Sequence, residues 1–202
     1  STIMGSCNWR NDMPKGNVNK NPNDPRAARS VRDIKNTMLS LVEREPFAQI
    51  RVEQILSEAP VQSNTFYKYF ASKQDVLDAI GDDLIARMRQ ELETLQPRNL
   101  RGGVMVFYNV INTDEPAYGK LFSEEEYAEF QEKIRDDFFD SDYFMDFCNN
   151  DEYVEIVPAF IGNVAAGTYR RWRENDNGKK RSLEQLADSI AELLLNGLKE
   201  TE

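Results

Sequence analysis

The sequence predicts an all-helical protein with a small N-terminal three-helix unit and a larger C-terminal helical domain. After Arg26, apolar residues recur at the three- and four-residue spacing of a helix face, and no segment alternates convincingly as a half-buried strand does. Pro46, Pro60 and Pro97 interrupt this pattern, because proline cannot continue a helical hydrogen-bond ladder. Several apolar segments also follow serines that match helix-starting capping boxes.

The first two helices are each bounded by a proline. Arg29–Arg44 carries apolar residues at helical spacing and ends before Pro46. Arg51–Glu58 follows, and Pro60 ends it because a proline disfavours helical geometry in the residue before it. The residues expected on the inner faces are Val31, Ile34, Met38, Leu41, Val42, Val52, Ile55, Leu56 and Ala59.

The third helix, Gln62–Phe70, is short and has two different sides. At 100° per residue, Phe66 and Phe70 share one side and are expected to anchor it. The other side carries hydrogen-bonding side chains, which are Asn64, Thr65, Tyr67 and Lys68.

The C-terminal helices are delimited by capping boxes and by prolines. Ser72 is expected to cap a long helix that reaches Leu95 before Pro97, and Ser123 and Ser182 match further capping boxes. The remaining expected helices are Leu100–Asn112, Tyr118–Phe122, Ser123–Asp140, Tyr153–Arg173 and Leu183–Lys199, with Asp140–Asp151 irregular or one turn long.

Composition argues against catalysis. The 202 residues contain no histidine, which excludes His-containing metal sites and the Ser-His and Cys-His dyads. Cys7 and Cys148 are the only cysteines and form no CxxC motif. We therefore expect no catalytic residue, no metal and no cofactor. Mean hydropathy is −0.64, and neither a membrane-spanning stretch nor a signal peptide is evident, so we expect a cytoplasmic protein without a membrane partner.

The charge is distributed unevenly along the chain. Residues 1–80 hold 11 Lys and Arg against 9 Asp and Glu, whereas residues 81–202 hold 14 against 26. The net charge of −10 therefore resides in the C-terminal part, and the N-terminal part is slightly basic. A nucleic-acid partner is compatible with the N-terminal part alone.

The three N-terminal helices match the geometry of helix-turn-helix DNA binding. In this geometry apolar anchors hold the second helix of the motif, and its outward side offers donors and acceptors to bases and phosphates. Lys73 adds a positive charge at the start of the next helix. The alternative is that Tyr67, Tyr69 and Lys73 are ordinary surface residues of a helical domain.

The run from Thr65 to Lys73, with Val76 and Leu77 behind it, resembles the hallmark Thr-Phe-Tyr-x-x-Phe-x-Ser-Lys segment of TetR-type repressors. The strong match covers about residues 29–80. The stretch around Trp172 and the Ser182-Leu-Glu-Gln185 box give a weaker match over residues 153–199. This resemblance implies domains at 26–73 for DNA binding and 74–202 for effector binding and dimerisation.

The resemblance also implies roles for individual residues. Ser63 and Asn64 would face bases, since an asparagine can pair with adenine through two hydrogen bonds. Residues implied in phosphate contacts are Arg51, Thr65, Tyr67, Tyr69 and Lys73, with Tyr67 also near bases.

Three residues depart from the pattern of the family. Pro60 replaces a common glycine, Gln62 replaces a capping serine, and Glu53 brings a carboxylate near the phosphates. We therefore expect a weaker cap on the recognition helix.

Residues 1–25 are rich in Asn, Pro, Gly and Lys and are expected to form a flexible arm. Trp9 could anchor it. A basic arm can also enter a DNA minor groove, and the alternative is a plain tail.

The C-terminal part is expected to bind an effector and a second copy of the chain. The expected partners are double-stranded DNA, a small-molecule effector of unknown identity, and a homodimer partner. Residues expected to line the effector pocket are Phe107, Tyr108, Tyr118, Phe122, Phe138, Phe139 and Phe144. Residues expected at the dimer interface are Phe160, Val164, Leu186, Ile190 and Leu193. In both cases the alternative is that these side chains fill the protomer's own core.

The sequence thus predicts a ligand-responsive, homodimeric transcriptional regulator, in the sense of a repressor that an effector releases from DNA. One alternative is a TetR-like adaptor that acts through a protein partner. A small enzyme using carboxylates and a tyrosine is the remote alternative.

Overall fold

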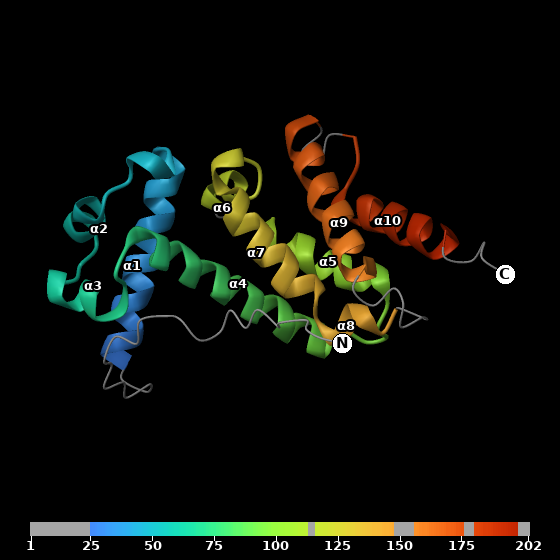
Figure 1. The fold of residues 1–202 in the computed structure, drawn as a ribbon, viewed down its shortest axis with the longest axis horizontal. Coiled ribbons are helices and arrows are strands. Elements are labelled where there is room, and N and C mark those ends of the chain that lie inside the picture. The colour runs from blue at the N-terminus through green and yellow to red at the C-terminus, as the bar shows by residue number, and fades with distance from the viewer. Residues whose placement is uncertain (1–24, 113–115, 148–155, 176–179, 198–202) are drawn as a thin grey trace, which may run out of the picture.

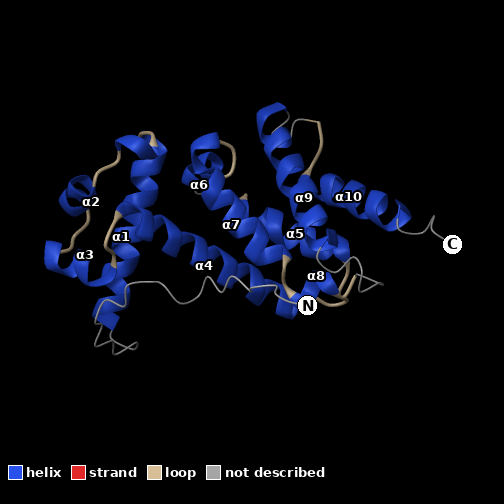
Figure 2. Ribbon diagram, in the orientation of Figure 1, coloured by secondary structure: helices blue, strands red, loops and turns tan. Residues whose placement is uncertain are grey.

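The structure is a computed structural model that describes residues 25–112, 116–147, 156–175 and 180–197. Within these residues every regular element is a helix and no strand occurs (Figure 2). This confirms the all-α prediction. Among the described helices, none combines the length and the apolarity that crossing a bilayer requires. Cys7, Trp9 and Cys148 lie outside the described residues, as does the expected arm up to residue 24.

The N-terminal unit consists of three helices and a single 3-10 turn. Its elements are α1 (Pro25–Arg44), η1 (Phe47–Gln49), α2 (Val52–Glu58) and α3 (Ser63–Tyr69). Helix α1 contacts both α2 and α3, so it forms the support on which the two short helices rest. It begins four residues before the expected Arg29, because a proline is tolerated in the first turn of a helix, where its missing N–H costs nothing.

Helix α4 (Lys73–Thr94) leads from the N-terminal unit into the rest of the molecule (Figure 1). The expected cap is confirmed: the Ser72 hydroxyl oxygen accepts the backbone N–H of Asp75 at 3.2 Å. The Asp75 carboxylate in turn accepts the N–H of Ala71 at 2.8 Å. The domain boundary expected between residues 73 and 74 falls at the start of α4 and stays a prediction.

The central elements are α5 (Leu100–Ile111), α6 (Pro116–Leu121), η2 (Glu125–Tyr127), α7 (Ala128–Phe139) and α8 (Asp142–Met145). The prediction that Ser123 caps a helix over Ser123–Asp140 is wrong. The Ser123 hydroxyl donates to the carbonyl of Gly119 at 2.6 Å, and α7 begins five residues later. The Glu126 carboxylate, the expected partner in that box, accepts instead the backbone N–H of Phe47 at 3.0 Å.

The last two helices are α9 (Ile156–Asn175) and α10 (Leu183–Gly197). The Ser182 capping box is confirmed, because Ser182 N donates to the Gln185 side chain at 2.9 Å and Gln185 N donates to the Ser182 hydroxyl at 3.3 Å. The expected start at Tyr153 and the expected end at Lys199 lie outside the described residues.

Buried apolar residues form one continuous cluster from α1 to α10. Helix α4 packs against α5 and α7, and α10 packs against α5 and α9. The N-terminal unit therefore lies at one end of the molecule and α10 at the other (Figure 1), with α4 between them.

The cap assignments lead to a stability prediction. Ser182→Ala is expected to lower the free energy of unfolding by about 1 kcal/mol, because the first turn of α10 loses its acceptor. Ser189→Ala, on the exposed side of the same helix, is the matched control and is expected to change it by less than about 0.5 kcal/mol, since that hydroxyl only donates to the Gln185 carbonyl one turn earlier in the helix. Urea unfolding measures both values, and equal losses would contradict the assignment.

Candidate nucleic-acid interface

Helix α3 is fixed by two aromatic anchors and presents polar side chains outward. Phe66 is 0% and Phe70 6% exposed, with their rings 5.8 Å apart. Ser63 and Asn64 are exposed, and Tyr67 keeps 59% of its surface accessible. Thr65 and Tyr69 are half-buried. The structure therefore brings the predicted base-facing residues together on the accessible side of a short, well-anchored helix.

The start of α3 lacks a side-chain cap. Gln62 occupies the N-cap position and its side chain makes no capping hydrogen bond, as expected from the replacement of a serine. The backbone carbonyl of Gln62 accepts the N–H groups of Thr65 and Phe66 at 2.8 and 3.1 Å. The first turn thus relies on backbone bonds and on the burial of Phe66.

Arg51 precedes α2 as its N-cap residue and is exposed. Its backbone N–H donates to the Gln54 side chain at 2.7 Å, which fixes the start of α2. The Arg51 guanidinium has no ion pair with any described residue, so its charge is available to an anionic partner. The exposed Glu53 lies in the same first turn and opposes that charge.

Lys73 makes contacts that no local sequence pattern predicts. Its ammonium donates to the carbonyl oxygens of Phe47 at 2.6 Å and Ile50 at 2.8 Å, with Ala48 at 3.4 Å. It also lies 4.5 Å from the centre of the Phe47 ring. Lys73 therefore ties η1 to the start of α4, and a phosphate contact by this residue would compete with these carbonyls.

The aromatic residues expected in the effector pocket mostly contact one another. Phe107, Phe138, Phe139 and Phe144 are at most 2% exposed, and neighbouring ring centres lie 4.6 to 5.9 Å apart. These four rings fill the core between α5, α7 and α8. Their role in an effector pocket stays a prediction.

The other three expected pocket residues have different surroundings. Tyr108 is buried and donates to the Ala165 carbonyl at 3.2 Å, and burial raises the pKa of its phenol. Phe122 packs on Phe130 with ring centres 5.7 Å apart, and Tyr118 is half-buried. Of the seven predicted residues, Phe107 and Phe122 line a cavity of about 200 Å³ between α5, α7 and α9.

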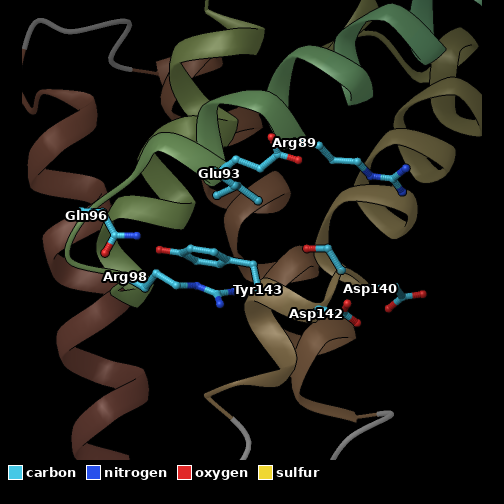
Figure 3. A pocket seen from close by; sticks show the side chains of 9 residues that line it. Arg89, Glu93, Gln96, Arg98, Asp140, Asp142 and Tyr143 are labelled. Carbon is cyan, nitrogen blue, oxygen red and sulfur yellow. The ribbon is translucent and has the colours of Figure 1, made fainter.

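A larger cleft of about 520 Å³ lies at the far end of α4 (Figure 3). Its labelled lining residues from the α4 side are Arg89, Glu93, Gln96 and Arg98, and those from the α7–α8 side are Asp140, Asp142 and Tyr143. No short motif marks this cleft in the sequence, because its lining is spread over residues 89–143 and looks like a solvated charged surface.

Charged side chains of both signs line this cleft. The Arg98 guanidinium lies 4.6 Å from the centre of the Tyr143 ring and pairs with Asp146 at 2.8 Å. Burial, together with the negative charges of Asp136 and Asp137, raises the pKa of the Asp140 carboxyl. Within the described residues, no group of acids, cysteines or histidines is arranged to hold a metal ion.

The residues expected at the dimer interface divide into two sets. Phe160 is 54% and Leu193 74% exposed, and Val164 is half-buried. Leu186 and Ile190 are 6% and 4% exposed and lie in the protomer's own core, where α10 packs against α5 and α9.

The Lys73 contacts lead to a second prediction. Lys73→Met keeps the aliphatic chain and removes the three donors, so we expect the free energy of unfolding to fall by about 1–3 kcal/mol. Lys68→Met on exposed α3 is the matched control, because the Lys68 ammonium contacts only the Tyr69 ring at 5.4 Å among its described interactions. Thermal or urea unfolding measures both variants. A Lys73→Met chain as stable as Lys68→Met would show that the carbonyl contacts contribute nothing.

Comparison with known proteins finds a curated relative that bears on the sequence resemblance. No family model matches the chain. The HTH-type transcriptional regulator EthR of Mycolicibacterium smegmatis is 30% identical over 135 residues, covering 58% of this chain and 62% of that protein. The match thus spans less than two thirds of the relative's length. The match and the helical architecture agree with the sequence resemblance: the chain is similar to an HTH-type transcriptional regulator, and its described residues form the all-helical fold that the resemblance predicts.

Proposed function

We propose that this chain is a transcriptional regulator that binds an operator in double-stranded DNA as a homodimer and is released by a small-molecule effector. The observation that carries the proposal is α3. A seven-residue helix held by Phe66 presents Ser63, Asn64 and Tyr67 to solvent, and the exposed Arg51 stands at the start of the preceding helix α2. The similarity to an HTH-type transcriptional regulator supports the same role.

The accessible side of α3 offers the donors and acceptors that reading of a major groove requires. A groove about 12 Å wide admits one helix, and base edges offer donor and acceptor pairs to an asparagine or serine. Thr65, Tyr67 and Tyr69 would hold the flanking phosphates. Arg51 would contribute a charge from the start of α2. Lys73 would reach a phosphate only by exchanging at least one of its carbonyl partners.

A homodimer would explain the exposed apolar side chains at the other end of the molecule. Phe160 on α9 and Leu193 on α10 are more than half exposed, and the equally accessible Ile156 precedes Phe160 by one helical turn. Packing α9 and α10 against a second copy would remove these groups from water. Two-fold symmetry would then bring two α3 helices to half-sites about 34 Å apart on one face of the duplex.

The effector would act by shifting the population of two dimer arrangements. An effector that binds one arrangement better changes the DNA affinity by its difference in affinity, typically about 1–3 kcal/mol. The cavity lined by Phe107 and Phe122, of about 200 Å³, is a candidate site that an effector would enlarge. The 520 Å³ cleft at the far end of α4 is the second candidate, since it falls in the usual range of ligand sites.

Selection of bound sequences from a random DNA pool tests the proposal directly. We expect an enriched site with two inverted half-sites separated by about one helical turn. Absence of binding to any duplex at low salt would overturn the DNA-binding role. An enriched site without internal symmetry would overturn the homodimer.

Base reading by α3 gives a third prediction. Asn64→Ala is expected to relax the preference at one base position in each half-site by about 1–3 kcal/mol. Arg51→Ala is the contrasting variant: it is expected to weaken binding to all sequences and to flatten the salt dependence by up to about 1 per lost phosphate contact. Titration of labelled duplexes at several salt concentrations separates the two effects. A binding profile that Asn64→Ala leaves unchanged would contradict base reading.

The dimer interface gives a fourth prediction. Phe160→Glu and Leu193→Glu place carboxylates on the exposed α9–α10 surface and are expected to yield folded monomers. Glu174→Gln, which changes the charge at an exposed position near the end of α9, serves as a control that stays dimeric. Light scattering measures the mass, and circular dichroism checks that the helices persist. Dimers in both glutamate variants would place the interface elsewhere.

A further inference from the structure

The turn between α6 and α7 contacts the N-terminal unit directly. The Glu126 carboxylate of η2 accepts the backbone N–H of Phe47 at 3.0 Å. The Tyr127 ring, 2% exposed, meets the Phe47 ring edge-on with centres 6.0 Å apart. Phe47 is thereby held from the C-terminal side of the molecule, although it belongs to the loop that joins α1 and α2.

The other side of η1 leads to the groups proposed to contact DNA. The Phe47 carbonyl and ring hold the Lys73 ammonium, and the Ile50 carbonyl accepts from it at 2.8 Å. Arg51 follows Ile50 and starts α2. A displacement of η1 would therefore move Lys73 and Arg51 together.

Gln131 on α7 links η2 to the cavity between α5, α7 and α9. Its amide nitrogen donates to the carbonyls of Leu121 at 2.8 Å and Glu124 at 2.9 Å, which are the last residue of α6 and the N-cap residue of η2. Its amide oxygen accepts from Arg170 at 2.8 Å. Gln131 and Arg170 both line the cavity of about 200 Å³, so an occupant there would meet the groups that hold this turn.

We propose that Glu126 and Gln131 are positioning residues that couple this cavity to the proposed phosphate-contacting groups Arg51 and Lys73 through η1. This inference rests on the proposed DNA-binding function and deepens it by naming a regulatory route. Ordering η1 in advance lowers the cost of ordering Arg51 on the DNA. A cavity occupant that recruits the Gln131 amide would loosen η2 and thereby η1.

The test compares full-length chains that carry Glu126→Ala, Gln131→Ala or both changes with Glu125→Ala. Glu125 lies on the same 3-10 turn and is exposed, so its variant removes the same charge without the Phe47 contact. Hydrogen exchange of the amides at residues 47–51, measured without DNA, is expected to accelerate at least about threefold in Glu126→Ala and in Gln131→Ala, because each releases a hydrogen bond on the route. In Glu125→Ala it should match the unmodified chain.

DNA titration supplies the second readout. Glu126→Ala is expected to bind the selected operator about threefold to tenfold more weakly than Glu125→Ala, the loss typical of one hydrogen bond. Glu126→Gln keeps an acceptor oxygen and should recover most of that loss. The double variant should lose less than the product of the single losses, because both residues act through one contact.

The outcomes separate this inference from the proposed function. If the unmodified chain binds no DNA, the proposed function fails, and the exchange measurement still decides whether η2 orders η1. If exchange at residues 47–51 is the same in all chains, or if Glu126→Gln binds as weakly as Glu126→Ala, the route is overturned even when the operator is bound normally.

Discussion

The burial of Phe66 is the interaction on which the DNA-binding interpretation depends. An isolated helix shorter than about 12 residues is marginal in water, so the seven residues of α3 cannot hold a fixed shape by their own backbone bonds. Gln62 contributes no side-chain cap to compensate. Burying a phenylalanine contributes several kcal/mol when it is packed, which is far more than a cap supplies. The orientation of Asn64 and Tyr67 therefore follows from the packing of the opposite face.

Two contacts compete for the Lys73 ammonium: the backbone carbonyls of η1, which stabilise the fold, and the proposed DNA phosphate. Its position shortly after α3 would suit a phosphate contact, and the family resemblance implies one. In the structure its donors are directed at backbone carbonyls of η1. A phosphate offers a full negative charge where the carbonyls offer only dipoles, yet moving the ammonium leaves those carbonyls without their donor. The balance between the two arrangements depends on how firmly η1 is held, and Glu126 and Tyr127 hold it from the other side.

Local features of this fold were predictable from the sequence, and features set by distant contacts were not. The ends of α2 and α3 and the caps Ser72 and Ser182 follow from residues within a few positions of each other. Ser123 fails as a cap because Glu126 is engaged by Phe47, 79 positions away in sequence. Apolar periodicity likewise predicts the buried face of α10, but it does not predict which helix packs against that face. For that reason Leu186 and Ile190 were expected at an interface and lie in the protomer's own core.

The same limit applies to the cavities. A dense aromatic set can line a ligand site or fill a core, and composition does not distinguish the two. Here four of the seven predicted aromatic rings pack against one another. The cavity beside Phe107 and Phe122 has a volume of about 200 Å³. Since protein interiors are packed as densely as organic crystals, a ligand larger than this space must displace side chains rather than compress them. The side chains that can move aside are Gln131 and Arg170 at the edge of the cavity, because hydrogen bonds rather than ring packing hold them. Ligand entry would therefore disturb the polar contacts around η2 before it disturbs the aromatic core.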